Sequence, residues 1–236
     1  MALRTILVTG LRIVAACLLF AISFAVGGAL SGIDKIAQQR IAPQAAPPAN
    51  PVPAIPENLL RSFLIFTICV GGTLSYLILR SRWHGWKLAG ALFVSMYGIS
   101  TVASQLDSIA FLSSKLPPGM IRAIFIQGAL AEALFAPLAV LALGKWRAAP
   151  VRAPMSPAAA PKLATILLRV TILVAAFVFL YLFFGYYVAW RNPELQRYYG
   201  GQELATFWAA WKHNWMSSPW IYALTAFRAL IYVVCL

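Results

Sequence analysis

Long apolar runs alternate with short polar segments along most of the chain. Several runs approach the roughly 20 residues that a helix needs to cross the hydrocarbon core of a bilayer. The pattern predicts an all-α fold, a polytopic transmembrane helical bundle that forms a single membrane domain over residues 1–236. We expect about six spans, at residues 13–30, 62–79, 88–112, 121–143, 163–190 and 220–236.

The first apolar run allows two interpretations. Arg4 and Arg12 precede it and the small residues of GGALSG follow it, as in a secretory signal peptide that is cleaved. A retained helix is favoured, because the apolar run continues through Leu30 and Gly28-x-x-x-Gly32 is a small-residue pattern of helix packing. The sixth span stops at IYVVCL without a basic tail, which is expected of either a terminal helix or a truncated chain.

Two predicted outer loops differ in character. Residues 31–61 are rich in proline, which removes backbone donors and fixes φ, so we expect an extended extracytoplasmic connector. Residues 191–219 are expected to be structured, with Asn192 and Pro193 starting a helical turn.

Within the second loop, residues 202–215 are predicted to form an amphipathic helix. Its apolar face would carry Leu204, Phe207, Trp208, Trp211 and Trp215. Such a helix suits the outer membrane interface, and a lid over the mouth of the bundle is the alternative.

Composition and charge exclude some classes of protein and suggest an orientation. Only 11% of the residues are charged, 61% are apolar, and the mean hydropathy is +0.79. We therefore assign the net charge of +13 to basic residues that flank the spans, and nucleic acid is not an expected partner. The segments RSRWHGWK and KWRAAPVRAP concentrate Lys and Arg on one side. By the positive-inside rule, they predict a cytoplasmic N-terminus in a bacterial inner membrane.

Six polar residues inside the predicted spans form the candidate intramembrane polar site: Asp107, Glu132, Gln105, Gln127, Arg169 and Arg228. An ionisable side chain costs at least about 2.5–3.5 kcal/mol at the bilayer centre, so it usually faces the bundle interior and finds a partner. With a rise of about 1.5 Å per residue, Asp107 and Arg228 lie at similar depths, and so do Glu132 and Arg169. We predict these as two ion pairs.

Regular helical periodicity assigns some of these residues to faces. In the third span, Ser100, Ser104 and Asp107 share a face, while Gln105 points to the opposite side. The fourth span carries a stripe of small residues around Glu132, formed by Gly128, Ala136 and Ala139. Because small residues favour close helix packing, we expect Glu132 to face protein.

Signatures of catalysis are missing from the sequence. It holds no H-E-x-x-H, G-x-S-x-G or Walker motif, and its cysteines are isolated in apolar runs. His84 and His213, the two histidines, fall on opposite sides of the membrane in the predicted topology. We expect no cofactor and no metal, and nothing in the sequence favours an enzyme.

Two classes of function are consistent with this sequence. The first is small-solute or proton-linked transport through the intramembrane polar cluster. The second is a non-catalytic assembly or sensor component in which ion pairs only fix helix packing. The expected partners are the lipid bilayer and, for a transporter, a small solute or protons.

Overall fold

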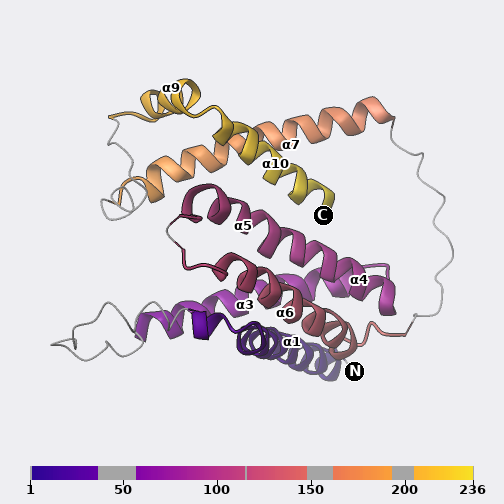
Figure 1. Ribbon diagram of the computed structural model, residues 1–236. Coiled ribbons are helices and arrows are strands. Elements are labelled where there is room, and N and C mark those ends of the chain that lie inside the picture. Colours follow the sequence, from indigo (N-terminus) through magenta and orange to yellow (C-terminus); the bar gives the residue numbers. More distant parts are fainter. Residues whose placement is uncertain (1, 37–56, 115, 148–161, 193–204, 236) are drawn as a thin grey trace, which may run out of the picture. The chain divides into compact units, whose positions relative to one another are not determined.

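The computed structural model describes residues 2–36, 57–114, 116–147, 162–192 and 205–235, and this part of the chain is helical, without a strand (Figure 1). Contacts divide the chain into two compact units. The first unit contains residues 1–105 and 113–154, and the second contains residues 106–112 and 155–236.

Five helices in the described residues are long and apolar enough to cross a membrane. They cover residues 6–31, 61–80, 85–112, 120–142 and 163–188. A sixth candidate is the C-terminal pair of helices, which is bent by 99° at a short break. The predicted all-α, polytopic membrane fold is therefore confirmed.

The first unit is built around helix α6. Its elements are α1 (Ala2–Ser31), α3 (Glu57–Arg80), α4 (Gly85–Met96), the π-helix η1 (Tyr97–Val102), most of α5 (Ala103–Asp107), and α6 (Met120–Ala142). Helix α6 packs against α1, α4 and η1, and α1 also packs against α3. The core of this unit joins apolar side chains such as Phe20, Ile78 and Phe135.

Glycines set both ends of α6. The segment Pro117–Pro118 cannot continue a helix, and Gly119 then takes a left-handed conformation (φ 83°) from which α6 starts. After the last turn, Gly144 (φ 72°) reverses the chain, and the amide of Lys145 donates to the carbonyl of Val140.

Glycines also let three pairs of chain segments approach closely in the first unit. A Cβ atom added at Gly128 would lie 2.1 Å from Thr101 Oγ1, and one added at Gly71 would lie 2.8 Å from Cys17 Sγ. A Cβ atom at Gly27 would lie 2.7 Å from the backbone oxygen of Gln127. The predicted Gly28–Gly32 packing pair is wrong in its second member, because Gly32 faces open space and ends α1 with φ 70°.

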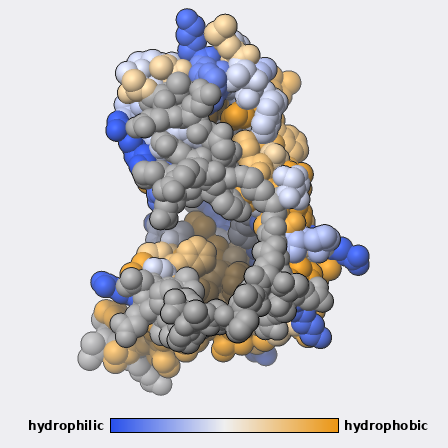
Figure 2. Space-filling model, turned by 60° about the vertical axis from the view of Figure 1, so that its left-hand side comes forward, coloured by the Kyte–Doolittle hydropathy of each residue, from blue (hydrophilic) through white to orange (hydrophobic). Residues whose placement is uncertain are grey.

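The second unit combines a long apolar helix with a bent helical pair. Its elements are η2 (Ser108–Leu112), α7 (Leu163–Phe184), η3 (Gly185–Ala189), α9 (Phe207–Ser217) and α10 (Trp220–Cys235). Helix α10 packs against α7, and α9 packs against η3. No residue of α7 is buried, although the membrane-spanning stretch that contains it has a mean hydropathy of 2.6. Such an exposed apolar helix is typical of contact with lipid, and Figure 2 shows apolar side chains on the surface of the molecule.

The predicted loops need correction where the structure describes them. Residues 57–61, assigned to the proline-rich loop, form the first turn of α3, while residues 37–56 lie outside the described residues. The helix predicted at 202–215 runs from Phe207 to Ser217, with the hydroxyl of Thr206 accepting from the amide of Ala209 at 3.2 Å. Residues 193–204 are outside the described part, and with them Pro193 and Leu204.

The predicted apolar face of α9 divides into two parts. Phe207 is buried among aromatic rings of η3 and α7, and Trp211 packs against the same cluster. By contrast, Trp208 and Trp215 keep 67% and 60% of their surface exposed.

The close approach of α6 to η1 predicts that Gly128→Ala destabilises the protein. The added methyl group would overlap the Cβ of Thr101 as well as its hydroxyl, so a change of rotamer cannot relieve the clash. We expect a loss of about 1–3 kcal/mol, read as a lower unfolding temperature in detergent. Gly72→Ala in α3 is the matched control, because nothing lies within 4 Å of its new methyl group. Equal unfolding temperatures for the two variants would contradict the packing described here.

Candidate functional site

Glu132 is a buried carboxylate in the first unit, where the small-residue stripe of α6 packs against its neighbours. Its exposed fraction is 6%, while Ala136 and Ala139 are fully buried. The prediction that Glu132 faces protein is thereby confirmed. No described residue of the first unit forms an ion pair with it, so its negative charge would have no nearby counter-charge there.

Ser100 of η1 is the direct partner of this carboxylate. Its hydroxyl is hydrogen-bonded to Glu132 Oε1 and also lies 2.7 Å from the carbonyl oxygen of Met96. The second carboxyl oxygen, Oε2, is buried and has no hydrogen-bond partner among the described residues. A buried polar atom left unpaired costs free energy, so the site has unused capacity for a proton or a polar ligand.

The backbone is irregular on both helices beside Glu132. Residues 97–102 form the π-helix η1, whose wider turns disturb the usual hydrogen-bond ladder. On the facing helix, Pro137 has no amide hydrogen, so the carbonyl of Ala133 loses its helical donor one residue after Glu132. Both helices are therefore locally weakened near the carboxylate.

Serine hydroxyls contact backbone carbonyls in and beside the irregular stretch. The hydroxyl of Ser104 donates to the carbonyl of Ser100 at 2.5 Å. In the same way, the hydroxyl of Ser100 can donate to the carbonyl of Met96 at 2.7 Å. Such bonds give a backbone carbonyl of the preceding turn a side-chain donor within an apolar helix.

Asp107 forms a second polar centre, within the second unit. Arg228 of α10 donates through Nη1 to Asp107 Oδ2 at 2.6 Å, which confirms the ion pair predicted from depth. Tyr181 of α7 donates its hydroxyl to the same oxygen at 3.2 Å, and the guanidinium carbon lies 4.8 Å from the centre of its ring. Asp107 thus receives an ionic and a neutral donor, while Arg228 is held by charge and by a cation–π contact.

The Asp107–Arg228 contact leaves part of both side chains without hydrogen bonds. Asp107 Oδ1 and Arg228 Nε are both buried without a hydrogen-bond partner among the described residues. The contact therefore uses one oxygen and one nitrogen rather than the two-pronged geometry that arginine offers to a carboxylate.

Among the described residues of the first unit, neither predicted glutamine is hydrogen-bonded to Glu132. Gln105 is buried in the first unit, with its carbonyl oxygen unpaired among the described residues. Gln127 packs against α1, where its amide nitrogen lies 3.3 Å from the position of a Cβ at Gly28. Arg169 is exposed on α7 in the second unit, and its pairing with Glu132 stays a prediction because the two residues belong to different units.

The predicted common face of Ser100, Ser104 and Asp107 is not matched by a common partner. Ser100 contacts Glu132 in the first unit, whereas Asp107 contacts Arg228 in the second. Ser100 lies in the π-helix η1, which precedes Ser104 and Asp107 of α5 and has about one more residue per turn than a regular helix. The 3.6-residue periodicity on which the prediction rested therefore does not hold through this stretch.

Tyr181 is the residue of the Asp107 centre that sequence reasoning missed. It lies in a run of aromatic residues, FVFLYLFFGYY, in which no single hydroxyl stands out. Its spacing places it one helical turn after Phe177, and the centres of the two stacked rings are 6.3 Å apart, but this spacing does not point to Asp107.

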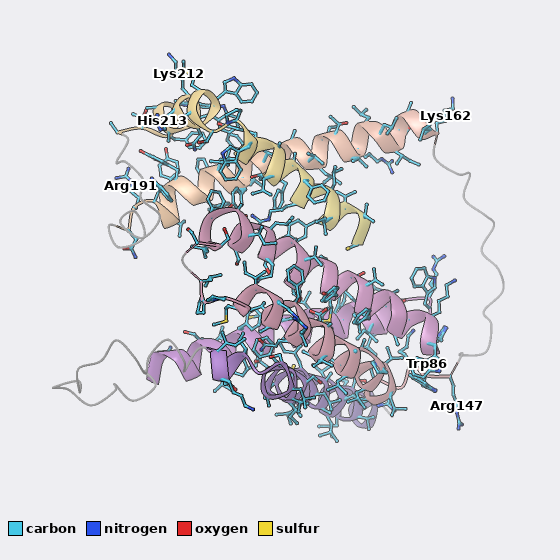
Figure 3. All side chains as sticks on the ribbon, in the orientation of Figure 1. Trp86, Arg147, Lys162, Arg191, Lys212 and His213 are labelled. Carbon is cyan, nitrogen blue, oxygen red and sulfur yellow. The ribbon has the colours of Figure 1, made fainter. Side chains whose placement is uncertain are left out.

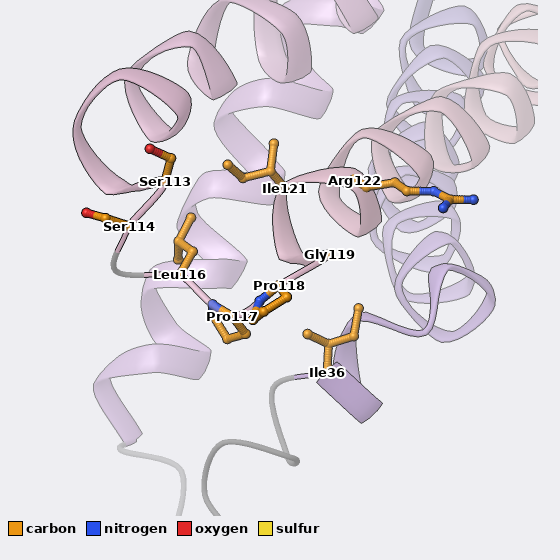
Figure 4. Close-up of a pocket in the computed structure, with 9 residues that line it drawn as sticks. All are labelled: Ile36, Ser113, Ser114, Leu116, Pro117, Pro118, Gly119, Ile121 and Arg122. Atoms are coloured by element: carbon orange, nitrogen blue, oxygen red, sulfur yellow. The ribbon is translucent and has the colours of Figure 1, made fainter.

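A surface hollow of about 770 Å³ lies at the end of the first unit where α6 starts (Figure 4). Its lining combines Ile36, Leu116 and Ile121 with Pro117 and Pro118. The side chain of Arg122 extends away from Ser113 and Ser114, so the polar groups that line the hollow do not converge on one point. Glu132 does not line it, and the hollow is not a convincing ligand site.

Comparison with known proteins adds no function to this geometry. Scans against protein-family models, curated proteins and solved structures find no match to the chain.

The Asp107–Arg228 contact predicts strong coupling between the two residues. Removing Asp107 leaves the buried guanidinium group of Arg228 without its counter-charge, a change that costs about 3–5 kcal/mol in fully buried pairs. The cost is smaller here, because the Asp107 side chain keeps 33% of its surface exposed. We expect Asp107→Asn and Arg228→Gln each to lower the unfolding temperature, and the double variant to lose less than the sum by about 0.5–3 kcal/mol. Thermal unfolding in detergent measures all three, with Lys162→Gln on the exposed start of α7 as the control. Additive losses would show that the ion pair does not stabilise the protein.

Proposed function

We propose that the protein mediates proton-linked transport of a small solute, with Glu132 as the group that binds and releases the proton. The support comes from a carboxyl group that is buried in an apolar helical unit, has no ion-pair partner there, and keeps one oxygen unpaired. Carboxylates with these properties inside membrane spans commonly serve as proton relays.

The hydrogen-bond count at Ser100 is the observation that carries the proposal. Its hydroxyl has one proton, yet it contacts two acceptors, the carbonyl of Met96 and Glu132 Oε1. Both contacts become hydrogen bonds when Glu132 is protonated and donates to Ser100 Oγ, which in turn donates to Met96. After deprotonation, Ser100 can donate to only one of them, so loss of the proton changes how α6 is held against η1.

The irregular backbone supports a conformational response to that change. A π-helix and an internal proline lie on the two helices that carry Ser100 and Glu132. Interrupted helices near the centre of a span are a recurrent feature of transporters, where they form binding sites and move. Because Glu132 is closed off from solvent here, transport requires at least one other conformation in which the carboxyl group is accessible.

A non-catalytic assembly or sensor role is the second candidate. It is favoured by the Asp107–Arg228–Tyr181 centre, in which an ion pair and a cation–π contact join α5, α7 and α10. Such a centre can specify helix packing without acting on any ligand. The two candidates differ in the role of Glu132: the first assigns it the transfer of a proton, and the second assigns it no function.

We assign the protein to a bacterial inner membrane with its N-terminus in the cytoplasm. The segments that follow α3 and α6 are rich in Lys and Arg. The positive-inside rule assigns such segments to the cytoplasmic side. In this orientation α9 lies on the outer side, and its exposed Trp208, Trp215 and Met216 insert into the membrane interface. Lys212 and His213 occupy the same end of the second unit as Arg191, while Lys162 occupies the opposite end of α7 (Figure 3).

Substitution of Glu132 by glutamine tests the proposed proton site. The amide keeps the size of the carboxyl group and cannot release a proton, so we expect Glu132→Gln to fold normally and to lose proton coupling. The measurement is the charge-displacement current of proteoliposomes on a solid-supported membrane after a pH step. We expect the current of the wild-type protein to disappear in this variant.

Two serine variants give a matched comparison for the same experiment. Ser100 and Ser104 both contact backbone carbonyls one turn earlier, but only Ser100 contacts Glu132. We therefore expect Ser100→Ala to change the pH dependence of the current and Ser104→Ala to leave it unchanged. Currents in Glu132→Gln that equal those of the wild type would overturn the proposal and favour the structural role.

The orientation is tested by labelling single cysteines. In a background with Cys17, Cys69 and Cys235 replaced by serine, Lys212→Cys should react with a membrane-impermeant maleimide added to intact cells. Arg147→Cys should react only after the membrane is permeabilised, because the segment after α6 faces the cytoplasm. The reverse labelling pattern would place the N-terminus outside.

A further inference from the structure

Three chain segments meet at one end of the first unit. The amide of Gly85 donates to the carbonyl of Lys145 at 3.0 Å, and Lys145 Nζ donates to the carbonyl of Ser81 at 2.6 Å. These bonds join the turn between α3 and α4 to the turn after α6. Arg12 of α1 reaches the same place, since its guanidinium group lies 2.9 Å from the position of a Cβ at Gly144.

Six cations gather there, and we call this surface the basic end: Arg12, Arg80, Arg82, Lys87, Lys145 and Arg147. All except Lys145 are exposed. None of the described residues at this end is acidic. At the opposite end of the unit, by contrast, the exposed Asp34 lies next to Lys35. The described residues of the first unit therefore do not neutralise the positive charge of the basic end.

Three tryptophans accompany these cations. Trp86 and Trp83 keep 72% and 47% of their surface exposed. The rings of Trp86 and Trp146 meet edge to face at 4.9 Å, and Lys87 Nζ lies 4.9 Å from the centre of the Trp83 ring. Figure 3 shows Trp86 and Arg147 close together at this end. Exposed tryptophans suit the headgroup level of a bilayer, so the neighbouring cations lie at the depth of lipid phosphates.

We propose that the basic end binds anionic phospholipids of the leaflet that it faces. Clusters of Lys and Arg directly beside membrane spans attract anionic headgroups, and pockets of such residues between helices hold individual lipids. The basic end meets the first condition, because its cations lie on three segments, and hydrogen bonds from Gly85 and Lys145 hold two of these segments together. The neighbouring tryptophan rings can contact the glycerol and upper acyl region of the lipid. A soluble polyanion would gain nothing from those exposed rings.

Lipid retention by the full chain tests this proposal. The protein is purified from mixed vesicles of phosphatidylglycerol and phosphatidylcholine in a mild detergent, and the bound lipids are counted by native mass spectrometry. We expect the wild type to retain phosphatidylglycerol preferentially. Arg82→Gln combined with Arg147→Gln should weaken that preference roughly 20- to 30-fold, because each of the two removed cations accounts for about a fivefold change in the affinity for an anionic lipid.

Two control pairs separate this effect from unfolding and from general loss of charge. Arg82→Lys with Arg147→Lys keeps the charge and should retain the lipid. Lys35→Gln with Arg122→Gln removes the same charge from the opposite end and should behave as the wild type. If the test variant Arg82→Gln with Arg147→Gln does not fold, Arg80→Gln with Lys87→Gln replaces it, because it removes two other cations of the basic end. Unchanged retention in the variants of the basic end would overturn the proposal. So would displacement of the lipid by inorganic phosphate, which would indicate a site for soluble anions.

Discussion

The removal of carboxylates from water is the constraint on which the rest of this structure depends. An apolar helical protein gains little from an acidic side chain unless that group finds a counter-charge, a donor or a proton. Asp107 meets the constraint with a counter-charge, because Arg228 and Tyr181 both donate to its Oδ2 atom. Glu132 has no ion-pair partner within its unit and rests on the hydroxyl of Ser100. The two carboxyl groups therefore suit different roles, one in packing and one in the proposed proton exchange.

The helices around these groups are built to tolerate irregular backbone. The span that carries Ser100 and Asp107 contains two π-helical segments, and α6 contains Pro137. Each feature frees backbone carbonyls, which is costly in lipid unless side chains compensate. In this span, serine hydroxyls contact the carbonyls of Met96 and Ser100. Ser100 also contacts Glu132, so it connects the local backbone to the state of the carboxyl group, which gives the proposed transport a mechanical basis.

The basic end of the first unit bears on how the protein sits in the bilayer. At the basic end of the first unit, cations from separate segments lie beside exposed tryptophans, so charge and aromatic surface are presented together. This arrangement would fix the depth of the helices in the bilayer as well as select lipids. The level of Glu132 relative to the headgroups would then follow from the anchoring of α3, α4 and α6 at that end.

The sequence by itself determined the apolar spans, the inward-facing stripe around Glu132 and the pairing of Asp107 with Arg228. These follow from quantities that are local or nearly so, namely hydropathy, helical period and rise per residue. The contact of Ser100 with Glu132, the donor hydroxyl of Tyr181 and the packing of Gly27 in place of Gly32 were decided only by the tertiary structure. The physical reason is that π turns change the helical period without a recognisable residue pattern, and that glycine contacts depend on which helix lies opposite. A polar side chain takes its role from the neighbours that packing brings to it.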